Sequence, residues 1–277
     1  MLSILSGLLV GISLGLTGGG GAVFAVPLLV YGQGLSPRAA VAVSLFSVGV
    51  TALAGFLSRL RRGDVELRPG LLFAAAGVIG APLGSAIAAR IPEFLLMLLM
   101  GILMLMIAIR MWRARSVEPR VPGDTADCAE AADCSVQLPA AACRRDNFGQ
   151  LLLTTRCARL LLTVGLGAGV LSGLFGVGGG FLIVPALVEF SEMPLRRAVG
   201  TSLLVIFLVS LSGIAARLMN GQLPEAGAVG FFLPGSLAGL WIGQSASRKL
   251  PQRTLQRVFS VAILVVALVM IVKNVSS

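Results

Sequence analysis

The chain has 277 residues, of which 56% are hydrophobic and only 12% are charged, and its mean hydropathy is +0.95. A soluble domain carries about 25% charged residues, so this composition excludes an ordinary water-soluble protein and indicates an integral membrane protein. The formal net charge is +10, but the basic residues lie in clusters between apolar stretches, as in the loops of a protein that crosses the bilayer several times. We therefore expect contact with the lipid bilayer and no nucleic-acid partner.

The low aromatic content (6%) and the 35 glycines favour closely packed helices over a β-barrel. The chain has no His, which is the commonest metal ligand and acid–base side chain. The four cysteines have spacings that match no common zinc pattern, and we expect them to be reduced thiols. Because there is no nucleophile–base cluster either, we expect no enzyme activity, no metal and no cofactor.

Stretches without acidic or basic residues divide the chain into predicted membrane segments. The first, residues 1–37, has no basic region at its start, so we interpret it as a membrane segment and not as a cleaved signal. It is too long for one span, and glycines interrupt it near its middle, as they do in residues 160–188. Six other stretches are close to the 20 or so residues that a spanning helix needs. These six are 39–58, 69–89, 94–109, 198–216, 226–247 and 258–272.

The sequence between the two sets of segments is rich in Ala, Pro, Asp and Arg and has no apolar periodicity, which is typical of a solvated linker. The predicted organisation is a first transmembrane repeat over 1–112, a linker over 113–146 and a second transmembrane repeat over 147–277. The fold class is an all-α polytopic membrane protein with about eight transmembrane segments. Each repeat would consist of a glycine-broken first segment, either re-entrant or a pair of short helices, followed by three transmembrane helices.

The two halves are related by a shift of 158 residues. Ten of the twenty positions in Gly11–Val30 are identical to those in Gly169–Val188. Matches continue without a gap beyond this segment, which indicates a duplicated unit. The later matches include Arg38 with Arg196, Val41 with Val199, Ser44 with Ser202, Gly55 with Gly213 and Arg59 with Arg217.

The distribution of basic residues favours repeats of opposite orientation. If each broken stretch crosses the membrane once, the Lys and Arg residues outside the linker divide six against eight between the two sides. If each broken stretch returns to its own side, they divide ten against four. The positive-inside rule therefore predicts inverted repeats, with a cytoplasmic linker and both termini outside.

Each half carries the motif Gly-x-x-Gly-x-Gly-Gly-[Ala/Gly]-x4-Pro. A glycine run interrupts a helix, and the backbone amides that it frees inside a membrane must meet neighbouring groups or line a polar cavity. The helix that follows the run directs the positive end of its dipole toward the break, so two such breaks near the midplane could bind a small anion. The alternative is that the glycines only allow close helix packing. The candidate residues are Gly18, Gly19, Gly20, Gly21 and Pro27, and then Gly176, Gly178, Gly179, Gly180 and Pro185.

An anion is the expected substrate because all twelve acidic residues lie in loops or at the edges of the predicted spans. Ser44, Thr201 and Ser202 lie about two turns into the helices that follow the motifs and could supply hydroxyl donors. They could instead donate to carbonyl groups of their own helices. Arg38 and Arg196 could attract anions at the two mouths or could anchor the helix ends at the membrane interface.

The segments GLTGGGGAVFAVPLL (15–29) and GLFGVGGGFLIVPAL (173–187), each followed by its Arg and Ser, resemble the sulfite exporter TauE/SafE family, also called the toluene sulfonate uptake permease family. The resemblance covers both halves and leaves out only residues 113–146. It implies a multi-pass transporter of the bacterial inner membrane for sulfite, sulfonates or other small anions, often sulfur-containing.

The expected function is therefore secondary transport of a small anionic substrate that binds between the two glycine-broken segments. One alternative is a channel-like anion pore. Another is a non-transporting membrane scaffold in which the glycines serve packing alone. The sequence carries no signal for the direction of transport, the energy coupling, the oligomeric state or the role of the Cys-containing linker.

Overall fold

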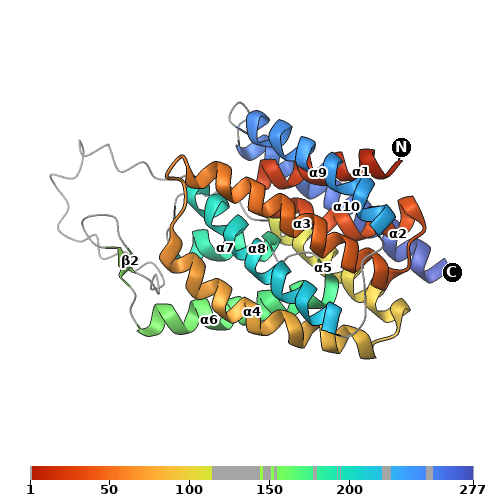
Figure 1. Ribbon diagram of the computed structural model, residues 1–277, viewed down its shortest axis with the longest axis horizontal. Helices are drawn as coiled ribbons and strands as arrows, with labels where there is room; N and C mark the ends of the chain where they lie inside the picture. Colours follow the sequence, from red (N-terminus) through yellow and green to blue (C-terminus); the bar gives the residue numbers. More distant parts are fainter. Residues whose placement is uncertain are drawn as a thin grey trace.

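The structure is a computed structural model in which the helices lie along one common direction (Figure 1). It describes residues 2–113, 144–145, 151–152, 155–176, 180–191, 193, 195–219, 226–247 and 252–276. Gly178 and Gly179, two of the predicted site residues, lie outside the described residues. The prediction of a helical protein is confirmed, and the described part contains one small exception. It is a short antiparallel pair formed by β1 (Arg144–Arg145) and β2 (Leu151–Leu152).

The first half begins with a helix that breaks at the glycine run. Gly34, in the left-handed conformation, ends the short helix that follows the break. Ser36 then caps the next long helix by accepting a hydrogen bond from the Ala39 amide, and Pro37 lies in the first turn of that helix. The elements are α1 (Leu2–Thr17), the 3-10 turn η1 (Gly20–Phe24), α2 (Ala25–Gln33), α3 (Pro37–Leu60), α4 (Leu67–Arg90) and α5 (Glu93–Arg113).

The second half has the same order of elements. Both broken stretches therefore form a helix, a glycine-rich break and a shorter helix, as the glycine run predicts, and the six uninterrupted stretches each form one helix. The elements are α6 (Thr155–Phe175), α7 (Gly180–Ser191), α8 (Leu195–Met219), α9 (Ala226–Ala246) and α10 (Gln252–Ser276).

The helices have the length and composition of membrane spans. Four segments are long and apolar enough to cross a bilayer by themselves, namely Pro37–Leu60, Leu67–Arg90, Cys157–Phe175 and Arg196–Met219. Shorter apolar helices accompany them, and many large apolar side chains are exposed on the outside of the bundle. A multi-pass membrane protein is therefore the consistent interpretation.

The first broken stretch doubles back on itself. The amide of Gln33, in the last turn of α2, donates to the hydroxyl of Ser6 in the first turns of α1 (Nε2 to Oγ, 3.1 Å). The end of α2 therefore lies beside the beginning of α1, and the chain returns to the end of the bundle from which it started.

Rows of glycine allow the longest helix contacts. A methyl group on Gly7, Gly11 or Gly15 of α1 would overlap the carbonyl oxygens of Phe232, Ser236 and Leu240 in α9, in that order. The same direction of pairing shows that α1 and α9 are parallel. Glycines of α4 and α6 bring those two helices together in the same parallel manner. At these positions the glycines allow close helix packing, because backbone meets backbone without side chains between.

The centre of the bundle is the crossing of α3 and α8 (Figure 1). Gly55 faces Leu203, Gly49 faces Ser210 and Gly213 faces Leu45, so the two helices are antiparallel. The repeat shift matches α3 with α8, and these two helices run in opposite directions where they meet.

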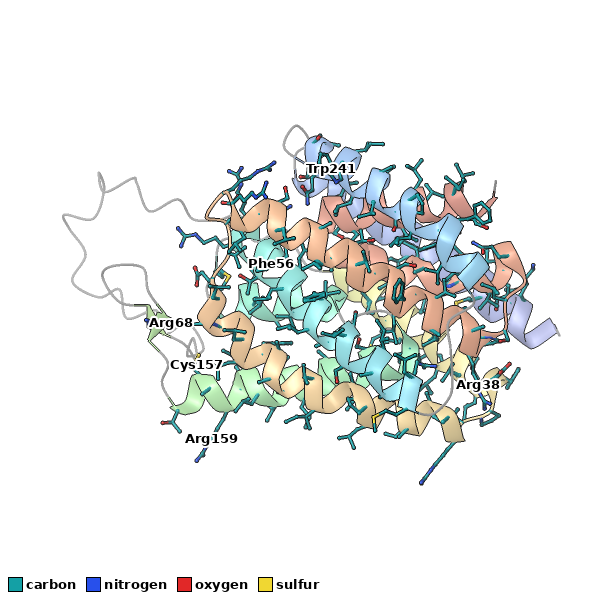
Figure 2. The ribbon with its side chains drawn as sticks, viewed as in Figure 1. Arg38, Phe56, Arg68, Cys157, Arg159 and Trp241 are labelled. Carbon is teal, nitrogen blue, oxygen red and sulfur yellow. The ribbon has the colours of Figure 1, made fainter. Side chains whose placement is uncertain are left out.

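The two ends of the bundle carry different charged groups. Arg38 lies at one end, near the end of α10, whereas Arg68, Cys157 and Arg159 lie at the other (Figure 2). At the Arg38 end, that arginine pairs with Glu93 (3.6 Å). At the opposite end, the loop between α3 and α4 is held to the start of α8 by two ion pairs. These are Arg196 with Asp64 (3.4 Å) and Arg197 with Glu66 (3.2 Å).

Candidate functional site

Each helical break turns at a glycine in the left-handed conformation. Gly18 has φ of +74° and Gly176 has φ of +70°, a region that L side chains rarely adopt. Both turns are also closed sterically, since a methyl group on Gly18 would overlap Val199 and one on Gly176 would overlap Val41. Val41 and Val199 are themselves matching positions of the repeat. Glycine is therefore required at both turns by backbone conformation and by space.

The two turns are held by serines from opposite halves. The hydroxyl of Ser44 on α3 donates to the carbonyl oxygen of Gly176, and that of Ser202 on α8 lies at the same distance, 2.7 Å, from the carbonyl oxygen of Gly18. Ser202 also lies 2.9 Å from the carbonyl of Val199 in its own helix. Both serines are fully buried. The structure thus brings the predicted serines to the glycine breaks, where they satisfy carbonyl groups that the breaks leave exposed.

The breaks meet near the middle of the bundle. A methyl group on Gly19 would lie 2.7 Å from the backbone of Gly180, so the two segments approach with nothing between them. Gly19, Gly20 and Gly21 are buried, and Gly21 packs against the backbone of α1. Within the described residues, the amides of Gly19, Gly20 and Gly21 donate to no carbonyl group, because the first bond of η1 runs from Ala22 to Gly19. These buried amides are donors without a described acceptor.

Other predicted residues support this region from further away. Pro27 is buried inside α2, and Pro185 lies within α7. Thr201 lies elsewhere, because its hydroxyl accepts a hydrogen bond from the Glu66 amide (3.0 Å) and so fixes the loop between α3 and α4. The structure therefore does not bring Thr201 to the glycine breaks.

The predicted mouth arginines are engaged in ion pairs at the two ends of the bundle. The Arg38 side chain is 46% exposed beside Glu93, and the Arg196 side chain is 68% exposed beside Asp64. Pairs this exposed contribute about 0–1 kcal/mol, so they orient the side chains more than they stabilise the fold. Both arginines remain accessible to anions arriving from solution.

Sequence reasoning missed several polar groups in the interior. Arg217, in the last turn of α8, is only 5% exposed, and its guanidinium lies 3.5 Å from the Gly173 carbonyl oxygen. The hydroxyls of Ser47, Ser172 and Ser210 are buried and have no hydrogen-bond partner among the described residues. The repeat pairs Arg217 with Arg59, but it does not indicate that Arg217 is buried. The three serines belong to no motif, and only their position on buried helix faces could have indicated them.

No group of three metal-binding side chains occurs among the described residues. Cys157, at the start of α6, is buried and disulfide-bonded, so the expectation of reduced thiols is wrong at this position. The sequence could not indicate this, because a disulfide depends on which residues the fold brings together.

The crossed hydrogen bonds lead to a first prediction. Ser44→Ala and Ser202→Ala each remove the donor to a buried turn carbonyl, which costs about 1–3 kcal/mol when the carbonyl finds no replacement. We expect each variant to lower the thermal unfolding temperature in detergent. Ser210→Ala is the matched control, since it removes a buried hydroxyl without a described partner and should leave that temperature nearly unchanged. Equal effects of all three variants would show that the turns do not depend on these hydrogen bonds.

Comparison with known proteins identifies the group to which this architecture belongs. The family model for the sulfite exporter TauE/SafE proteins matches residues 3–270. A probable membrane transporter protein of Xylella fastidiosa (strain Temecula1) is 34% identical over 98% of this chain and 94% of its own length. The probable membrane transporter protein YunE of Bacillus subtilis (strain 168) is 24% identical over 99% of this chain and 98% of its own length.

No solved structure matches the sequence significantly. The match to the family nevertheless spans both glycine breaks, both serine-bearing helices and all the described helices of the bundle. These relatives are named as membrane transporters and not as enzymes. The chain is a member of the sulfite exporter TauE/SafE family of membrane transporters.

Proposed function

We propose that this protein is a secondary transporter of a small anion, which binds between the two glycine-broken segments. The observation that carries the proposal is the pair of left-handed glycine turns at Gly18 and Gly176, each tied to the opposite half by a buried serine. Such a paired break is costly in a membrane and has little value for packing alone. Broken segments at corresponding places in two repeats are typical of transporter binding sites.

The chemistry of the breaks favours an anion over a cation. The donors at the first break are the backbone amides of Gly19, Gly20 and Gly21, at the positive end of the helical dipole that follows. The ion-paired carboxylates among the described residues, Asp64, Glu66 and Glu93, lie at the ends of the bundle. A cation at the breaks would therefore meet N–H groups, whereas an oxyanion would accept hydrogen bonds from them.

The family name supports sulfite, sulfonates and related small oxyanions as the first substrates to test. The named relatives are described only as probable membrane transporters, so they favour transport without selecting a substrate. A channel-like anion pore and a non-transporting scaffold are the alternative functions. A scaffold would use the glycines for packing alone, as those of α1 and α9 are used.

Inverted repeats would allow this site to open toward either side of the membrane. The repeat shift relates α3 to α8, and these helices cross antiparallel at the centre. The return of α2 to the start of α1 makes the first broken stretch a re-entrant hairpin, and the repeat implies the same for the second. Rocking of one half against the other would then expose the site to each side in turn.

The positive-inside rule places the Arg68 end of the bundle, and with it the linker, in the cytoplasm of a bacterium with this protein in its inner membrane. Arg61, Arg62, Arg196 and Arg197 belong to the same end. The Cys157 disulfide argues for the opposite orientation, because disulfides are rare in the cytoplasm. The charge asymmetry is the stronger argument, since it rests on many residues.

Transport in proteoliposomes tests the function directly. We expect the purified protein to move labelled sulfite or one of a panel of small sulfonates. Gly20→Val should abolish the flux while the protein still inserts, because it adds bulk and a β-branched side chain where the amides face the ligand. Gly167→Ala is the matched control, since a methyl group there meets no atom within 4 Å and should leave the flux unchanged.

The outcomes separate the alternatives. Wild-type flux in Gly20→Val would move the site away from the break and return the glycine to a packing role. A folded wild-type protein that moves no anion in the panel would favour the scaffold. Flux that does not saturate as the anion concentration rises would favour the channel-like pore.

Labelling of single cysteines tests the orientation. In intact cells, an impermeant thiol reagent should reach a cysteine at Ala89 but not one at Arg62, since both residues are exposed and lie at opposite ends of the bundle. Permeabilised cells should allow labelling of both. If both positions react in intact cells, α4 does not cross the membrane, and if only Arg62→Cys reacts, the orientation is reversed.

A further inference from the structure

Two buried hydrogen-bond donors without partners lie along the same pair of helices. The hydroxyl of Ser47 on α3 is fully buried, and the Nε2 atom of Gln244 on α9 is also buried. Neither atom has a hydrogen-bond partner among the described residues. A buried donor without a partner costs about 1–3 kcal/mol, so two on one interface require a physical reason.

Polar side chains connect these two donors. The hydroxyls of Thr51 on α3 and Ser236 on α9 are 2.9 Å apart, and both residues are almost fully buried. Nearer the end of α3, Ser58 donates to the Oε1 atom of Gln244 (3.3 Å), while the Nε2 atom of the same amide faces Gly55. We call Ser47, Thr51, Ser236 and Gln244 the polar track.

The polar track leads from the glycine break to one end of the bundle. At the end nearer the break it is preceded by Ser44, which lies one turn before Ser47. The Ser44 hydroxyl donates to the Gly176 carbonyl. At its other end, Gln244 meets Ser58, which is next to Arg59 and close to the loop that carries Arg62. At about 1.5 Å per residue, Ser44 to Ser58 covers about 21 Å of the helix axis. The track and these two neighbouring serines therefore extend from the candidate site to the Arg68 end of the bundle.

The matching interface of the other half has no such track. The repeat shift places Val205 and Val209 at the positions of Ser47 and Thr51. The glycine contacts place Gly77 and Ser85 of α4 at the positions of Ser236 and Gln244 of α9, because Gly77 meets Gly169 as Ser236 meets Gly11. Three of these counterparts have no polar side chain, and the fourth, Ser85, donates to the Pro82 carbonyl of its own helix (2.9 Å). Since both interfaces have the same helix arrangement, packing does not require the polar residues of α3 and α9.

We propose that the polar track is the cytoplasmic half of the substrate path, in which Ser47 and Gln244 donate hydrogen bonds to a small oxyanion between the glycine breaks and the cytoplasm. This inference rests on the transport function proposed above and adds the residues that select and conduct the substrate. Neutral donors suit a path, because an anion must bind well enough to enter and weakly enough to leave. The hydroxyls of Thr51 and Ser236 donate to the carbonyl oxygens of Ser47 (2.6 Å) and Leu233 (2.9 Å), so each would exchange that bond for one to a passing anion.

Removal of the two unpartnered donors tests the path. Ser47→Val introduces the residue that α8 carries at the same position of the repeat, and Gln244→Ala removes the side-chain amide. Each loses a hydrogen bond to a charged substrate, and we expect each to lower labelled-sulfite flux in proteoliposomes about tenfold. Ser210→Ala is the control, because its buried hydroxyl also lacks a described partner but lies between α3 and α8. Its flux should stay within about twofold of wild type.

A second measurement does not depend on transport. In a background with the native cysteines replaced by Ser, Ser47→Cys should be modified by an impermeant methanethiosulfonate applied from the cytoplasmic face, as read by mass spectrometry of the intact protein. Ser210→Cys should remain unmodified. A modified Ser47→Cys in a protein that moves no anion would uphold the path and contradict the transport function. Normal flux in both Ser47→Val and Gln244→Ala, with an unmodified Ser47→Cys, would overturn the path and leave the transport function standing.

Discussion

A carbonyl group released by a helix break inside a membrane must find a hydrogen-bond donor, because the lipid offers none. In this protein the carbonyl oxygens of Gly18 and Gly176 find their donors in Ser202 and Ser44, each on a helix of the opposite half. Neither half can therefore satisfy its own break. This reciprocal dependence determines how the two halves meet and where a ligand could lie.

The packing of the helices shows the same dependence of each half on the other. Glycine rows bring α1 of the first half against α9 of the second, and α4 of the first against α6 of the second. The antiparallel crossing of α3 and α8 then positions the serines at the two turns. The result is a centre in which the polar groups are backbone amides and hydroxyls and the ion pairs stay at the ends. A site of this kind can hold an oxyanion without a fixed countercharge, so release remains possible.

Much of this could be predicted from the sequence, because the repeat shift and the glycine run are local patterns with direct backbone consequences. The breaks, the six uninterrupted helices and the importance of Ser44 and Ser202 follow from them. The sequence could not indicate which group each polar side chain would contact. Thr201 is adjacent to Ser202, yet a rotation of about 100° around the helix turns it toward Glu66 instead of the break. The polar track was missed because its residues come from α3 and α9, which only the fold brings together.

Co-expression of the two halves as separate chains, divided within the linker, tests the central claim most directly. If each half supplies the donors and helix faces that the other needs, residues 1–113 and 144–277 should copurify in equal amounts from the membrane. Each half expressed alone should be degraded or should aggregate. Replacing both Ser44 and Ser202 by Ala should weaken the copurification. Two halves that are separately stable and do not associate would contradict the account, because each break would then be satisfied within its own half.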